Sequence, residues 1–185
     1  DIMVAPNDDA QLSRIMLTND TEHTRELDIT SYGELVLAQA SAHERHPAFS
    51  KLFIHSEYLE DRQALLFERR AKSPAEQPPV MLHRLVSSDS AVAFTGYETS
   101  RRQFLGRHGN LAQPLGASRA LAGTTGWTLD PIMALQGRVK LAPGARVQLD
   151  FVTLVANTRE EVFALAERFA SAPTFDWVTE DARRT

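Results

Sequence analysis

The residues best suited to chemistry lie between positions 97 and 130, in a stretch that combines arginines, aromatic rings and several glycines. Tyr97 precedes Arg101 and Arg107, and Trp127 follows near the end of the stretch. A sugar stacks its apolar face on an aromatic ring, while its hydroxyls accept hydrogen bonds from the fork of a guanidinium. We therefore predict a carbohydrate contact at Tyr97, Arg101, Arg107 and Trp127.

The same stretch allows a purely structural interpretation. Arg101 and Arg107 could pair with Glu98 and Asp130 and only pin the loop, as many surface ion pairs do. Trp127 suits an exposed stacking ring as well as a plug in the core. Both alternatives stay open from the sequence alone.

Other polar clusters offer weaker chemistry. His43 and His46 have a spacing that suits a metal on one helical turn, but no third ligand has a matching spacing. Glu57, Glu60 and Asp61 lie along one predicted surface turn, whereas glycoside chemistry needs two carboxyl groups facing each other across a cleft. Phosphate-loop, nucleophile-elbow and thiolate-zinc motifs do not occur. We predict no catalytic residue, no metal site and no cofactor.

Composition places the chain among ordinary globular domains. Its 185 residues are 43% hydrophobic and 24% charged, enough for one domain with a real core. The net charge of −4 argues against a nucleic-acid partner. Without cysteine, neither disulfides nor thiolate metal sites can form. No apolar run approaches the ~20 residues that a membrane-spanning helix needs.

Most of the sequence predicts β-strands, because apolar and polar residues alternate with a period of two. The predicted strands span residues 12–18, 25–38, 49–58, 64–69, 80–86, 92–97, 132–141 and 146–155. Short runs of turn-forming residues at 19–20, 87–90 and 142–145 predict three hairpins. Residues 101–126 are predicted to be irregular. Many short strands with such connections favour an antiparallel sandwich.

The period changes to that of a helix near the C-terminus. Thr158 and Glu161 form a predicted capping box, and apolar residues follow at helical spacing. We predict a β-sandwich over residues 1–157 and one amphipathic helix after it. A charged linker is predicted to complete the region 158–185.

Five segments, in this order, resemble a known family: residues 26–37, 46–53, 104–107 (Phe-Leu-Gly-Arg), 126–132 and 158–166. They resemble the N-terminal β-sandwich of the cellobiose and chitobiose phosphorylases, glycoside hydrolase family 94. The version inside bacterial cyclic β-1,2-glucan synthases is the most similar form. The resemblance extends over about residues 10–175.

The resemblance implies a galactose-mutarotase-like supersandwich of two antiparallel sheets, here partial. It also implies an (α/α)6 barrel later in the same polypeptide that holds the catalytic acid, which has no counterpart position in this chain. The implied partners are that barrel and a glucan oligosaccharide. The implied location is the cytoplasmic face of the inner membrane, as a soluble part of a larger membrane protein.

The beginning of the chain lacks an initiator methionine, so we expect a piece of a longer polypeptide. The resemblance further implies that the first strands of the sandwich are missing. Unpaired sheet edges recruit other strands. We therefore predict self-association through open edges.

Three functions are compatible with these observations. The leading hypothesis is a non-catalytic, carbohydrate-associated domain of a glucan-processing enzyme. The second is a purely structural or dimerisation module. The third is an aldose epimerase of the mutarotase type, which would need a histidine base and a carboxylate at one centre, conceivably His83 and Glu98.

Overall fold

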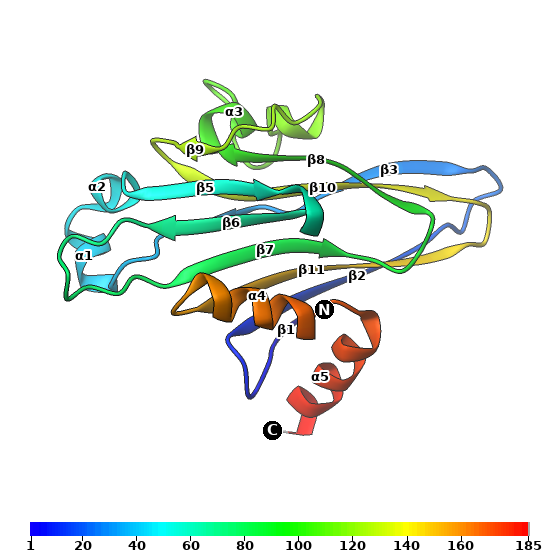
Figure 1. Cartoon of the computed structure of the whole chain (residues 1–185). Coiled ribbons are helices and arrows are strands. Elements are labelled where there is room, and N and C mark those ends of the chain that lie inside the picture. Colours follow the sequence, from blue (N-terminus) through cyan, green and yellow to red (C-terminus); the bar gives the residue numbers. More distant parts are fainter. Residues whose placement is uncertain (185) are drawn as a thin grey trace.

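Two antiparallel sheets packed face to face form the body of the computed structural model, which describes residues 1–184 (Figure 1). The larger sheet contains, in spatial order, β1 (Ile2–Val4), β2 (Ala10–Thr18), β11 (Arg146–Ala156), β7 (Val80–Val86), β6 (Ala64–Arg69), β5 (Ile54–Leu59) and β9 (Gly126–Trp127). In the smaller sheet, the central strand β10 (Pro131–Leu141) pairs with β8 (Val92–Ser100) on one side and with β3 (Arg25–Thr30) and β4 (Gly33–Glu34) on the other. The predicted antiparallel supersandwich is confirmed.

The main core lies between the two sheets and follows from strand alternation. In β11, Val147, Leu149 and Phe151 point inward and meet Leu135 and Val139 of β10. All five side chains are buried, and burial of apolar surface at about 25 cal/mol per Å² is what holds the layers together.

A second core forms on the outer face of the larger sheet. The helix α4 (Arg159–Arg168) lies over β11 and β7, and Val162 and Ala166 pack on Leu82 and Leu154. The predicted capping box begins this helix: the Thr158 hydroxyl accepts from the Glu161 N–H at 3.2 Å, and the Glu161 carboxylate accepts from the Thr158 N–H at 3.2 Å.

The C-terminal tail is a second helix, α5 (Ala172–Arg184), rather than the predicted charged linker. Phe175 and Val178 are buried in the same outer core, and Arg14 of β2 bonds Asp176 at 2.6 Å. Phe175 and Val178 are three positions apart, which is one helical turn, so the helical period was present in this stretch and was overlooked because of its charged residues. Within the described residues, every helix is too short or too polar to cross a membrane.

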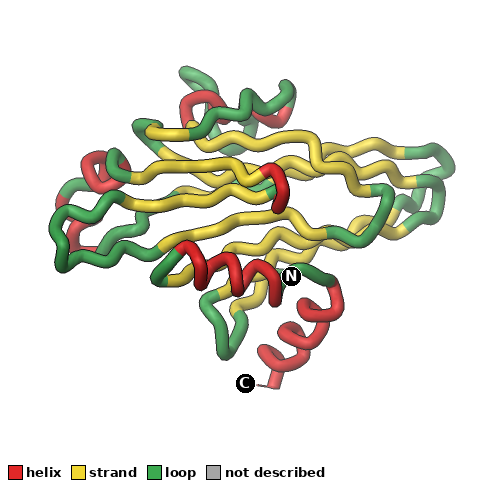
Figure 2. The backbone as a smooth tube through the Cα atoms, viewed as in Figure 1, coloured by secondary structure: helices red, strands yellow, loops and turns green. Residues whose placement is uncertain are grey.

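The three predicted hairpins are wrong. The turns after β2, β7 and β10 each carry the chain from one sheet to the other, so the flanking strands face each other across the core instead of pairing. These three connections, which we call the arches, gather at one end of the sandwich (Figure 2). Turn-forming residues report a chain reversal, but they do not reveal whether the two strands share a sheet.

Two other predicted strands are interrupted. The segment 25–38 splits into β3 and β4, with Ser31 and Tyr32 between them. The first part of 49–58 is the helix α2 (Pro47–Lys51), because proline fits the first turn of a helix. Shorter helices complete the chain: α1 (Ala40–Arg45), η1 (Glu60–Arg62), α3 (Arg101–Leu105) and η2 (Leu115–Ala117).

Candidate functional site

The helix α3, near the start of the stretch 97–130, packs on the outer face of the smaller sheet. The Ser100 side chain caps α3 by accepting from the Gln103 N–H, and Gly106 (φ 83°) ends the helix. Phe104 packs on Ile132 of β10 and stacks on the Tyr32 ring at 5.3 Å. These apolar contacts hold the start of the loop, and the charged side chains project from it.

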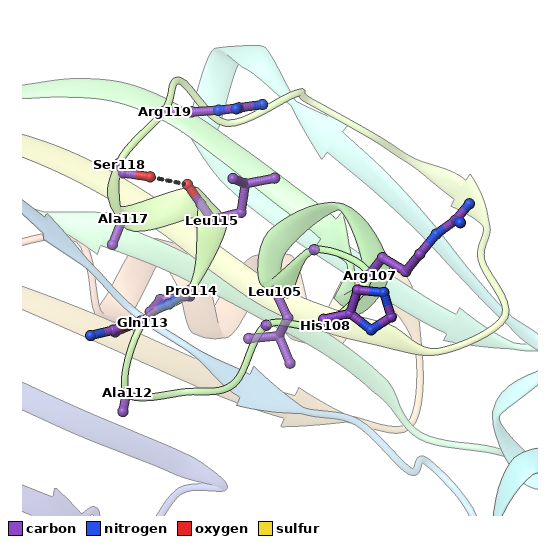
Figure 3. A pocket seen from close by; sticks show the side chains of 12 residues that line it. Leu105, Arg107, His108, Ala112, Gln113, Pro114, Leu115, Ala117, Ser118 and Arg119 are labelled. Carbon is purple, nitrogen blue, oxygen red and sulfur yellow. Dashed lines mark hydrogen bonds between the residues drawn. The ribbon is translucent and has the colours of Figure 1, made fainter.

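Arg107 borders an open groove of about 780 Å³ formed by the loop after α3 (Figure 3). Arg107 and Arg119 extend toward the same side, while Gln113 points the opposite way (Figure 3). Within residues 1–184, the Arg107 guanidinium forms no ion pair, so its donors are available to a ligand.

Arg101 belongs to an ion-pair network instead. Its guanidinium lies 3.2 Å from Glu34 and 3.7 Å from Asp130. Lys51 of α2 joins the same carboxylates, at 3.1 Å from Glu34 and 2.7 Å from Asp130. Burial alone would lower the pKa of Lys51, but the hydrogen bonds to Asp130 and Glu34 raise it overall, and the bond to Lys51 lowers the pKa of Glu34. The pinning interpretation is therefore confirmed for Arg101 and Asp130.

Glu98 makes no ion pair with an arginine in the described chain and is fully buried. Its carboxylate accepts from the N–H groups of Thr99 and Ser100 at 2.9 and 2.8 Å, and from the Thr124 hydroxyl at 3.2 Å. The predicted pairing of Glu98 with the arginines is wrong, because the chain's own donors already satisfy the carboxylate.

His83 and Glu98, the pair considered for an epimerase, do not meet. His83 lies between the sheets, bonded to Ser31 at 2.9 Å and to Thr153 at 3.0 Å. Glu98 is in register with Ala134, whose side chain packs under α3 on the opposite face of the smaller sheet. The two groups therefore cannot act on one anomeric carbon in this arrangement.

Tyr97 and Trp127 lie in different environments. Tyr97 is half-buried between the sheets, and its ring stacks on Tyr58 at 4.0 Å, which gives it a packing role. Trp127 is 60% exposed in β9, with its ring 5.1 Å from that of His55. Of the two interpretations of Trp127, the exposed ring is the one observed. The four predicted residues thus do not form one cluster.

The other polar clusters have structural partners. His43 bonds the Ser50 hydroxyl at 2.9 Å, Glu57 pairs with Arg159 at 2.5 Å, and Asp61 pairs with Arg62 at 3.6 Å. Across residues 1–184, the His, Asp and Glu side chains form no group of three that could hold a metal.

Lys51 and His55 were missed by sequence reasoning. Lys51 is 79 positions from Asp130, and His55 is 72 positions from its strand partner Trp127. Neither pairing leaves a local pattern. The period-two alternation of the predicted strand 49–58 indicates only that His55 faces away from the buried Ile54.

The glycosyl hydrolase 94 supersandwich domain matches residues 1–172. The chain is 34% identical over 176 residues to the cyclic beta-(1,2)-glucan synthase NdvB of Rhizobium meliloti (strain 1021), which covers 94% of this chain and 6% of that protein. It is 24% identical over 147 residues to the solabiose phosphorylase of Paenibacillus borealis, which covers 79% and 18% respectively. The chain thus spans less than a fifth of either relative. It belongs to the glycosyl hydrolase 94 supersandwich family.

Proposed function

We propose that this chain is a non-catalytic, carbohydrate-associated domain of a larger glucan-processing protein. In this proposal it packs on the (α/α)6 catalytic barrel of the same polypeptide and contacts a glucan oligosaccharide through Arg107 and Trp127. The proposal rests on the exposure of these two side chains, one polar and one aromatic, which project from the stretch 97–130. By contrast, Glu98 and His83 are buried and already form hydrogen bonds within the chain.

The proposal also assigns a supporting role to the ion-pair network. Lys51, Glu34, Arg101 and Asp130 tie α2, β4, α3 and the start of β10 together. Asp130 is three residues from Trp127, so the network restricts the segment that presents the ring. A pre-ordered ring loses less entropy on binding, which favours affinity.

The test is binding of a β-1,2-linked gluco-oligosaccharide to this chain, measured by calorimetry. We expect Trp127→Ala and Arg107→Ala each to weaken binding about tenfold, because a stacked ring or a charged hydrogen bond contributes on the order of 1–2 kcal/mol. Trp177→Ala is the matched control, since Trp177 is equally exposed at 61% but lies on α5. Unchanged affinity in both Trp127→Ala and Arg107→Ala would contradict the proposed binding role.

A second function, a structural or dimerisation module, is favoured by one specific observation. Ile2 and Val4 of β1 are 75% and 65% exposed. Met3 between them packs into the outer core, so these two side chains point to the inner face, where the larger sheet extends beyond the smaller one. Such a face and its free edge suit a second copy of the chain.

For this second function we expect concentration-dependent association in sedimentation velocity. The double substitution Ile2→Lys and Val4→Lys is expected to weaken self-association at least tenfold, because it places two charges on the apolar face. Leu129→Lys is the control, since Leu129 is 78% exposed elsewhere. A sharply monomeric species at high concentration would contradict the module. We also propose that the parent protein lies at the cytoplasmic face of the inner membrane, as the resemblance implies.

A further inference from the structure

We propose that the larger sheet carries a carbohydrate site on its outer face, a row of side chains formed by Trp127 of β9, His55 of β5, and Glu68 of β6 with Arg159. We call it the cross-strand row. The inference rests on the proposed function and adds a location, three further contact residues and a class of ligand, a neutral oligosaccharide chain.

Strand register brings these residues together. His55 pairs directly with Trp127 on one side and with Glu68 on the other. Residues directly opposite in an antiparallel pair place their side chains on the same face. Neighbouring strands lie about 4.8 Å apart, so the row from Trp127 to Glu68 spans roughly 10 Å, enough for two hexose rings in sequence.

The face is the outer one, and it is accessible. Glu68 bonds Arg159, the first residue of α4, at 3.4 Å, which places the row on the side that α4 covers. The helix itself packs over β11 and β7, and β5 and β6 lie beside it (Figure 1). Trp127 is 60% exposed and the Glu68 side chain 39% exposed.

Arg159 makes this surface rigid. Its guanidinium bonds Glu57 at 2.5 Å and Glu68 at 3.4 Å, and it lies 5.6 Å from the centre of the Phe163 ring. A planar fork held between two carboxylates presents fixed donors and acceptors. Both carboxylates remain about two-fifths exposed, so they keep lone pairs for ligand hydroxyls.

The charges select the ligand class. Glu68 of the row and the neighbouring Glu57 are two carboxylates that face one guanidinium, so this surface has an excess negative charge and repels phosphate or carboxylate groups. A neutral sugar fits: one ring stacks on Trp127, and the hydroxyls of the next donate to Glu68 and accept from Arg159. The tilted His55 ring lies between them, 5.1 Å from Trp127, and offers a further polar contact.

The experiment uses the fluorescence of Trp127. The chain has two tryptophans, so Trp177→Phe leaves Trp127 as the sole reporter. In that background we titrate a linear β-1,2-linked gluco-oligosaccharide and, separately, glucose 1-phosphate. We expect the neutral oligosaccharide to shift the emission of Trp127 and the phosphorylated sugar to leave it unchanged.

Substitutions then locate the site. His55→Ala and Glu68→Gln are each expected to weaken oligosaccharide binding at least fivefold at unchanged melting temperature. Glu60→Gln is the matched control, an exposed carboxylate on η1 outside the row. If both His55→Ala and Glu68→Gln bind the oligosaccharide with wild-type affinity, the cross-strand row is wrong. If Arg107→Ala nevertheless weakens binding, the proposed function remains supported. Absence of any binding overturns both.

Discussion

Acidification from pH 6.5 to pH 5 is expected to lower the free energy of unfolding by about 2 kcal/mol through His83 alone. Burial between the sheets disfavours the charged imidazole and lowers the pKa of His83 to about 4. The unfolded chain, with an ordinary histidine pKa, takes up a proton through this window while the folded chain does not. The contribution of neutral His83 to the free energy of unfolding is therefore fully present above about pH 6.5 and is lost as the pH falls toward 4.

Urea unfolding across this pH range, with and without His83→Gln, checks the prediction. The glutamine variant is expected to be less stable at pH 7, because its shorter hydrogen-bonding group must span Ser31 and Thr153, but to show a flatter slope between pH 6.5 and 5. The carboxylates with lowered pKa values, such as Asp28 and Glu34, act mainly below this window. Equal slopes in the two proteins would show that His83 takes up its proton in the folded state.

Strand positions were predictable because the signal is local. The predicted bounds 64–69 and 80–86 coincide with β6 and β7, and the capping box at Thr158 marked the start of α4 within one residue. Side-chain period and cap chemistry depend on neighbours in sequence, and each can be read without knowing the fold.

The arches were not predictable in the same way. Burial in β11 is nearly continuous from Val147 to Leu154, since one face meets the smaller sheet and the other meets α4. A hairpin with one buried face would instead expose every second residue. Polar residues interrupt both strands, and two of them, Asp150 in β11 and His83 in β7, are buried. Alternation in the sequence therefore could not show that these strands lie in the middle of a layered structure.

The candidate site shows a similar division. The carbohydrate contact at Tyr97, Arg101, Arg107 and Trp127 stays a prediction, and among these residues Arg107 and Trp127 are exposed. The structure separates Tyr97 into the core, binds Arg101 in a network and places Trp127 next to His55. Pairing between β9 and β5 joins residues 72 positions apart, and nothing in the local sequence specifies that register.

Asn19→Ala is expected to cost about 3 kcal/mol, because one buried side chain connects two arches. Asn19 is 4% exposed, and its amide nitrogen donates to the carbonyls of His23, Leu141 and Ala142 at 2.9, 3.0 and 3.1 Å. Its carboxamide oxygen accepts from Thr21. Alanine would remove all of these hydrogen bonds and leave the buried Leu141 carbonyl without its Asn19 donor, and an unpaired buried group costs more than the bond contributes.

Urea unfolding of Asn19→Ala and Asn110→Ala compares the loss in free energy of unfolding at an asparagine that connects two arches with the loss at one that does not. Asn110 also accepts backbone hydrogen bonds, from Ala112 and Gln113, but within a single exposed loop, so its loss is expected to cost less than about 1 kcal/mol. Asn19→Asp keeps the acceptor and removes the donors, and it is expected to fall near the alanine variant because a carboxylate would face three carbonyl oxygens. Equal stability of the Asn19 and Asn110 variants would mean that the apolar core alone holds the two sheets in register. A clearly larger loss of stability in Asn19→Ala than in Asn110→Ala would mean that the hydrogen bonds between the arches specify how the two sheets are joined.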